Sequence, residues 1–144
     1  MCYSGKTCIL FKEGINVIIG DNGFGKSKLY DAFYWVMYDQ VFESNKKEFI
    51  KTSSYKENLI SDKAKYDTPA GKVTAKVAIT FRDLENDKVI ILERKYSANN
   101  SNGSTVGDNA SELSVMKKDL SYLTARLVPD EEEKQRILKT ILPF

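Results

Sequence analysis

Four residues near the N-terminus have types and spacing suited to binding phosphate. Gly20, Gly25, Lys26 and Ser27 form the pattern Gly-x-x-x-x-Gly-Lys-Ser within the stretch GDNGFGKS. Glycine lets the backbone curl until successive N–H groups point at one anion, and a helix beginning at the lysine would add the positive end of its dipole. The pattern predicts a phosphate cradle for a nucleoside triphosphate.

The positions of this loop have separate roles in the predicted site. The Lys26 ammonium would contact the β- and γ-phosphates, and the Ser27 hydroxyl would ligate Mg²⁺. Asn22 and Gly23 extend the turn with residues that tolerate left-handed backbone geometry. The predicted ligands are ATP and Mg²⁺, with Lys26 as the catalytic residue and Ser27 as the metal ligand. The residues predicted to bind the nucleotide are Gly20, Asp21, Asn22, Gly23, Phe24, Gly25, Lys26, Ser27 and Lys28.

A phosphate cradle alone does not hydrolyse ATP, since hydrolysis also needs an acid near the metal and a group that orients water. Residues 89–93 (VIILE) form an apolar run that ends in an acid, as such a strand would. Arg94 and Lys95 follow this run directly, and a short turn pairs it with the strand before it, so a hairpin strand is the better interpretation. The sequence therefore supplies the binding half of a site without the hydrolytic half.

The elements that must position the loop lie on both sides of it. Residues 15–19 (INVII) are β-branched and predict a buried strand, with a shorter apolar strand before it at residues 7–11. A helix is expected from Lys26, because apolar residues recur at helical spacing through Met37. Strand, loop and helix in this order are the context that a phosphate-binding loop requires.

The middle of the chain predicts a different layer. Residues 44–72 are rich in Lys and Ser and predict an excursion over the surface. Residues 73–82 alternate apolar and polar side chains, and residues 88–96 return as their antiparallel hairpin partner. A polar, flexible loop is expected at residues 97–110, with a third strand at residues 111–117.

The C-terminal segment carries the clearest helix start in the sequence. Asp130 is the expected N-cap, Glu133 stands at capping-box spacing, and acids fill the first turn. Pro143 is expected to stop this helix. Its predicted apolar stripe is Ile137, Leu138, Ile141 and Leu142.

Composition limits the classes of function. The 144 residues fit a single domain, 1–144. The net charge of +2 does not indicate the basic surface that is typical of nucleic-acid-binding proteins. The absence of histidine excludes histidine-based catalytic bases and most zinc sites. Cys2 and Cys8 are too few for a disulfide framework, and no apolar run is long enough to cross a bilayer. We expect a cytoplasmic protein, with nucleoid association open, and no membrane partner.

Five aromatic residues on the predicted helix admit two interpretations. They could form a base-stacking surface, or they could be core and interface side chains of a helix packed beneath the loop. Burial preference favours the second interpretation. The residues are Tyr30, Phe33, Tyr34, Trp35 and Tyr38.

Three stretches resemble a known family. FKEGINVIIGDNGFGKSKLYDAFYWVMYD is similar to the N-terminal ATPase lobe of the SMC-like group of ABC-type ATPases. That group includes the structural-maintenance-of-chromosomes proteins, the double-strand-break-repair ATPase partnered with the Mre nuclease, RecF, RecN and DndD. VAITFRDLENDKVIILERKY resembles the hairpin of that lobe, and PDEEEKQRILKTILPF resembles the helix before its glutamine loop. Phe24 departs from the pattern, because the group has a small residue there.

The resemblance implies an α/β fold: an N-terminal lobe with a P-loop strand–loop–helix and an antiparallel β-hairpin layer. It implies Mg-ATP binding through Lys26 and Ser27, with hydrolysis dependent on a C-terminal lobe from the same or a companion chain. A second ATPase head is the further partner, and DNA is reached through the assembled complex. The process would be DNA repair, maintenance or defence, and the chain would be a lobe truncated before the glutamine loop.

Two other functions remain open from the sequence. A small P-loop kinase or phosphotransferase would use the same loop, but the hairpin at residues 73–96 disfavours it because such kinases have parallel sheets. A nucleotide-sensing module would bind without turnover.

Overall fold

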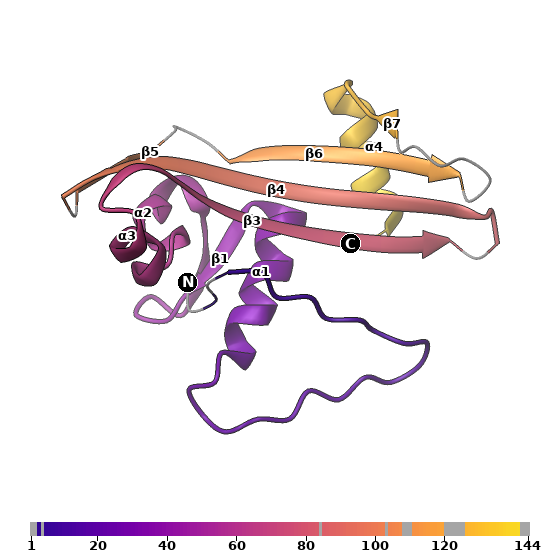
Figure 1. The fold of residues 1–144 in the computed structure, drawn as a ribbon. Coiled ribbons are helices and arrows are strands. Elements are labelled where there is room, and N and C mark those ends of the chain that lie inside the picture. Colours follow the sequence, from indigo (N-terminus) through magenta and orange to yellow (C-terminus); the bar gives the residue numbers. More distant parts are fainter. Residues whose placement is uncertain are drawn as a thin grey trace.

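One long antiparallel β-hairpin lies at the centre of the fold (Figure 1). A computed structural model describes residues 3, 5–83, 85–102, 104–107, 111–119 and 126–141. In it, β3 (Ala70–Asp83) and β4 (Lys88–Ser101) pair over 14 residues each, in the register Ala70↔Ser101 to Asp83↔Lys88. The structure confirms the hairpin expected from the alternating pattern and extends both of its strands.

The hairpin is part of a five-stranded antiparallel sheet. Its order is β3-β4-β6-β7, and β5 pairs with β4 at the end of the hairpin. The predicted third strand is confirmed as β6. The additional strands are β5 (Ser104–Gly107), β6 (Glu112–Asp119) and β7 (Arg126–Leu127).

Helices cover one face of this sheet. Alternate residues of β4 are buried on that face, where they meet the first and last helices in two apolar clusters. One cluster joins Trp35 to Tyr96 and Ala98, and the other joins Val36 to Leu92 and to the C-terminal helix. The helices are α1 (Lys26–Tyr38), α2 (Lys56–Leu59), α3 (Asp62–Asp67) and α4 (Glu131–Ile141), with a 3₁₀ turn at Thr52–Ser54. None of them, within the described residues, combines the length and apolarity needed to span a membrane.

Residues 44–72 are more structured than an excursion over the surface. A small hairpin of β1 (Gln40–Glu43) and β2 (Glu48–Lys51) opens the region, and α2 and α3 follow. Leu59 and Ile60 are 1% and 2% exposed and belong to the core cluster around Trp35. The prediction failed here because two isolated apolar residues in a polar stretch carry no periodicity that signals burial.

Residues 97–101 are strand and not loop. They continue β4 opposite the start of β3, and Ser97, Ala98 and Asn100 are buried. The Asn100 side-chain NH2 donates to the carbonyls of Lys65 and Thr68 at 2.8 and 2.7 Å, so its donors are paired although the residue is buried. Positions 103 and 108–110 of the predicted loop lie outside the described residues.

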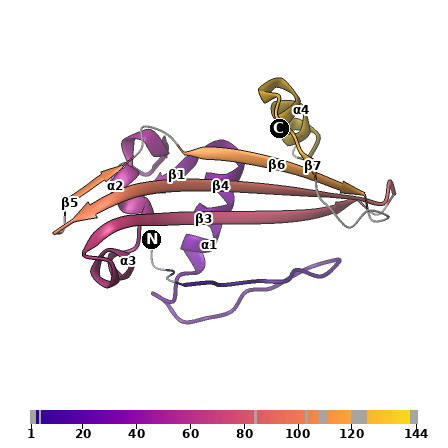
Figure 2. The same ribbon diagram turned by 45° about the horizontal axis from the view of Figure 1, so that its top comes forward.

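Residues 7–19, which we call the apolar arm, are not strands in the structure. No strand includes any of them, although all of them are described, and Leu10, Ile15 and Ile19 are 86%, 95% and 90% exposed. The expected short apolar strand at 7–11 and the expected buried strand at 15–19 are therefore wrong for this chain. A strand exists only where another segment pairs with its backbone, and the sheet of the described residues does not reach the arm (Figure 1, Figure 2).

The C-terminal helix begins as the sequence predicts. The Asp130 carboxylate accepts a hydrogen bond from the Glu133 backbone N–H at 2.8 Å, which confirms the N-cap. The Glu133 side chain does not complete a capping box, because it pairs with Lys117 of β6. Leu142 and the expected stop at Pro143 lie outside the described residues.

Replacing Asp130 by alanine is expected to destabilise the protein by about 1 kcal/mol, because one backbone N–H of α4 loses its acceptor. Urea unfolding followed by circular dichroism measures this change. Glu132→Gln is the matched control, since it removes a first-turn charge without removing the cap and costs at most about 0.5 kcal/mol. Equal losses for the two variants would contradict the capping role.

Candidate nucleotide-binding site

The glycine loop has the backbone geometry that its glycines allow. Gly23 and Gly25 adopt φ values of 90° and 87°, in the region that L side chains rarely enter. The Phe24 N–H faces the Asp21 carbonyl at 3.4 Å, which closes a turn before Gly25 leads into α1. These two glycines are therefore required by conformation.

Within the described residues, the N-terminus of α1 has no side-chain cap, and no acid lies in its first turn. In contrast, α3 is capped by Ser61 and α4 by Asp130. Because the first N–H groups of a helix have no partner inside it, the end of α1 beside the loop presents donors and a positive dipole.

The lysine of the motif lies over its own loop. Lys26 Nζ donates to the carbonyls of Gly20 and Asp21, the latter at 2.8 Å. Ser27 is exposed at the start of α1, and Asp21, Asn22, Gly23 and Phe24 are exposed on the loop. The structure thus brings Lys26 together with the residues that begin the motif.

Lys28 and Tyr3 differ from the sequence expectation. Lys28 forms an ion pair with Asp31 at 2.8 Å, and Asp31 is only 6% exposed. The Tyr3 hydroxyl donates to the Gly25 carbonyl at 3.0 Å, so a residue that the sequence gave no reason to select touches the loop. A lone tyrosine 22 positions away carries no signal that could have identified it.

The loop and helix start suit a Mg²⁺–triphosphate ligand. Mg²⁺ is commonly held by one or two protein oxygens together with phosphate oxygens and water, and the exposed Ser27 hydroxyl can be one of these. No group of three or more His, Cys, Asp or Glu side chains that could hold a metal occurs among the described residues.

An aromatic cluster covers the side of α1. Tyr34 stacks on Phe49 of β2 with ring centroids 4.3 Å apart, and Tyr30 lies 4.6 Å from Tyr34. The side-chain hydrogen bond with Tyr34 raises the pKa of Tyr30. Trp35 is fully buried as core, but Tyr30 and Tyr38 are 55% and 39% exposed. The core part of the interpretation is thus confirmed for Trp35, and an interface role for the two exposed tyrosines stays a prediction.

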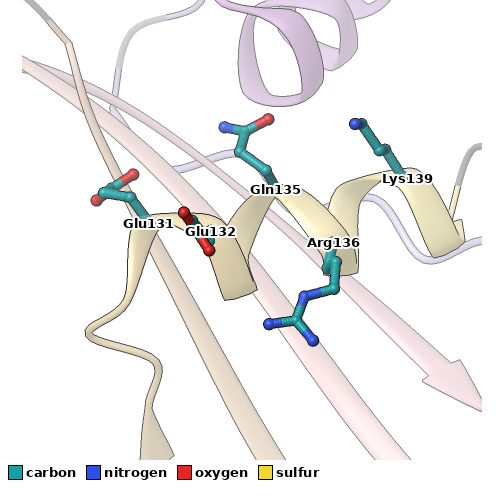
Figure 3. Close-up of a pocket in the computed structure, with 5 residues that line it drawn as sticks. All are labelled: Glu131, Glu132, Gln135, Arg136 and Lys139. Carbon is teal, nitrogen blue, oxygen red and sulfur yellow. The ribbon is translucent and has the colours of Figure 1, made fainter.

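The outer face of α4 bears an open hollow of about 390 Å³ (Figure 3). The acidic side chains that line the hollow lie in the first turn of α4 and the basic ones lie later in the helix, as the helix dipole favours. Figure 1 places α4 far from the glycine loop, so this hollow is not part of the nucleotide site. Its lining residues are Glu131, Glu132, Gln135, Arg136 and Lys139.

Comparisons with known proteins concern the chain as a whole. A family model described as an AAA domain matches residues 1–143. The chromosome partition protein Smc of Fusobacterium nucleatum subsp. nucleatum is 31% identical over 96 residues, which are 64% of this chain and 8% of that protein. The chromosome partition protein Smc of Halobacteriovorax marinus is 34% identical over 68 residues, 47% of this chain and 5% of that protein. The match thus covers less than a tenth of each relative. No solved structure matches the chain significantly.

Proposed function

The chain belongs to the AAA domain family, and we propose that it is the Mg-ATP-binding N-terminal lobe of an SMC-like ATPase. One observation carries the proposal: a loop with two left-handed glycines leads directly into a helix whose start has neither cap nor acid. That combination offers backbone donors to phosphate.

Each residue of the loop has a task in this proposal. The Lys26 ammonium exchanges the loop carbonyls for the β- and γ-phosphates, because charged oxygens accept its hydrogen bonds more strongly. Ser27 would offer its hydroxyl to Mg²⁺, and N–H groups at the start of α1 that have no partner within the helix would donate to the phosphates. The bound Mg-ATP supplies the reactive anhydride and the metal charge.

The apolar arm supports a second lobe as partner. Ile15, Val17 and Ile19 are 95%, 75% and 90% exposed, and Ile18 between them is 48% exposed. A segment that is apolar on both faces is typical of a strand buried inside a sheet. We propose that a C-terminal lobe, from the same or a companion chain, pairs with this arm and supplies the hydrolytic residues.

The process in which the protein acts is a further part of the proposal. The matched relatives are chromosome partition proteins by name, and this supports a role in DNA repair, maintenance or defence. A second ATPase head and DNA would be reached through the assembled complex, in the cytoplasm. The sheet of the described residues is antiparallel throughout, which disfavours a small P-loop kinase.

Adding the C-terminal lobe is expected to raise phosphate release from Mg-ATP at least about tenfold over this chain alone, since hydrolysis needs an acid and a positioned water. A phosphate-release assay on the chain, the lobe and their mixture measures the effect. Val17→Asp places a charge on the arm and should abolish the gain, whereas Tyr66→Asp, at an equally exposed site on α3, should retain it. The proposal would be contradicted if this chain alone hydrolysed Mg-ATP at the rate of the mixture, or if it phosphorylated a small acceptor.

A further inference from the structure

A polar cluster fastens the end of α1 that lies farthest from the glycine loop. Asp39 follows the helix in left-handed geometry, with φ 56°, and its carboxylate accepts hydrogen bonds from the hydroxyls of Ser111, at 2.6 Å, and Thr52. Arg94 Nη1 lies 3.6 Å from the same carboxylate and donates to Ser111 at 3.1 Å. Thr52, directly after β2, and Ser111, directly before β6, thus meet at one carboxylate.

Arg94 joins this cluster to the helix itself. Its Nε donates to the Val36 carbonyl, in the last turn of α1, at 3.2 Å, and the residue is only 7% exposed. Carbonyls at a helix C-terminus lack partners within the helix, and a cation there also favours the dipole. Burial lowers the pKa of Arg94, while the carboxylates of Asp39 and Glu131 act in the opposite direction. A guanidinium remains charged under such opposing effects.

The geometry of α1 makes this anchor consequential. Figure 1 shows the C-terminal end of α1 against the sheet and its N-terminal end, with the loop, projecting away from it. Of its buried residues, Trp35, Val36 and Met37 lie in the C-terminal half and belong to the two core clusters. Asp31 and Ala32 are buried near its middle, where the Asp31 carboxylate accepts a backbone hydrogen bond from β1 at 3.4 Å. The helix has 13 residues, so the loop lies roughly 15–20 Å from the anchored C-terminal end of α1.

A small tilt at the anchored end is amplified at the loop. Rotation by about 5° over that distance moves the loop by more than about 1 Å. A displacement of this size is large for a site that binds phosphate through several fixed donors. Hydrophobic contacts alone resist such a tilt weakly, because they are not directional. Arg94 supplies a directional hydrogen bond to the helix carbonyl and an ion pair with Asp39.

We propose that Arg94, acting through Asp39 and the Val36 carbonyl, is a positioning residue that sets the orientation of α1 and thereby of the phosphate-binding loop. The inference rests on the proposed nucleotide site for its functional meaning. The orientation itself is independent of any ligand and can be measured without one.

The first measurement is a distance between spin labels at Ser27→Cys, at the start of α1, and Thr80→Cys, on an exposed site of β3, with both native cysteines replaced by serine. Double electron–electron resonance should give a narrow distribution for the otherwise unchanged chain. Arg94→Lys keeps the charge but loses the planar fork, so the distribution should broaden or shift. Lys95→Gln, the neighbouring β4 residue, should leave it unchanged.

The second measurement is Mg-ATP affinity of unlabelled variants, titrated where circular dichroism shows each one fully folded. Arg94→Lys should bind roughly tenfold more weakly and Asp39→Asn roughly threefold more weakly, while Lys95→Gln binds as wild type. A purely structural role would lower thermal stability without changing the affinity of the folded protein. Should Arg94→Lys fail to fold, Ser111→Ala tests the same cluster through a milder loss, with a smaller shift in both measurements.

The two measurements separate the inference from the proposed function. Unchanged label distances and affinities in both Arg94→Lys and Asp39→Asn would overturn the positioning role. Absence of Mg-ATP binding by wild type would overturn the proposed function and the nucleotide part of the inference. The label distances would still decide whether Arg94 orients the helix.

Discussion

Replacing Lys26 by alanine is expected to weaken Mg-ATP binding at least about a hundredfold while leaving the fold intact. The ammonium would make charge-assisted hydrogen bonds to two phosphates, and each such bond contributes about 1.5–3 kcal/mol. In the present structure its partners are two loop carbonyls on an exposed surface, so its loss costs the fold little. Titration with a fluorescent ATP analogue measures the affinity.

Lys63→Ala is the matched control for this substitution. Lys63 is also an exposed lysine, paired with Asp67 on α3 at 2.8 Å, and its removal should leave nucleotide affinity unchanged. If Lys26→Ala binds Mg-ATP as tightly as wild type, every role assigned to the glycine loop is wrong.

Leu92→Ala is expected to destabilise the protein by about 3 kcal/mol, through lost burial and the cavity that remains. Leu92 is fully buried on β4, where it packs with Val36 of α1 and Val115 of β6. Urea unfolding measures the change. The same substitution at Leu10, which is 86% exposed on the apolar arm, should alter the stability of the isolated chain by less than about 0.5 kcal/mol. Similar losses at the two leucines would show that the cluster around Leu92 is not the core.

The hairpin and the terminal helix could be predicted because their signals are local. Residues 73–82 alternate in type, and the return strand pairs across a short turn, so period and turn chemistry agree. Asp130 and the acids after it mark a helix start within a few residues. Such features depend on neighbours in the sequence, and the sequence displays them directly.

The burial of other segments depends on partners that a local pattern does not contain. Residues 15–19 have the composition of a buried strand, yet they are exposed here because no described strand pairs with them. Residues 97–101 look like loop, yet β3 pairs with them and the side-chain NH2 of Asn100 donates to distant carbonyls. Composition predicts what a segment can bury, and topology decides whether it does.

The candidate site also contains residues that a local sequence pattern predicts and residues that only the structure reveals. The glycine loop and α1 could be recognised because the Gly-x-x-x-x-Gly-Lys-Ser spacing and the apolar period of the helix are local signals. Tyr3, which touches Gly25, and Arg94, which holds Val36, lie 22 and 58 positions from their contacts. Contacts of that range follow from the folded arrangement, so only the structure reveals them.

The apolar arm also bears on how the protein must be handled during synthesis. Its residues 15–19 are β-branched except for one asparagine, uncharged and exposed, a composition typical of segments that add to one another as strands and aggregate. Copies of the isolated chain compete with the proposed lobe for this segment, and that competition grows with concentration. Co-expression with the lobe should therefore raise the recoverable yield more than any change of the core, because it shortens the time that the arm spends uncovered.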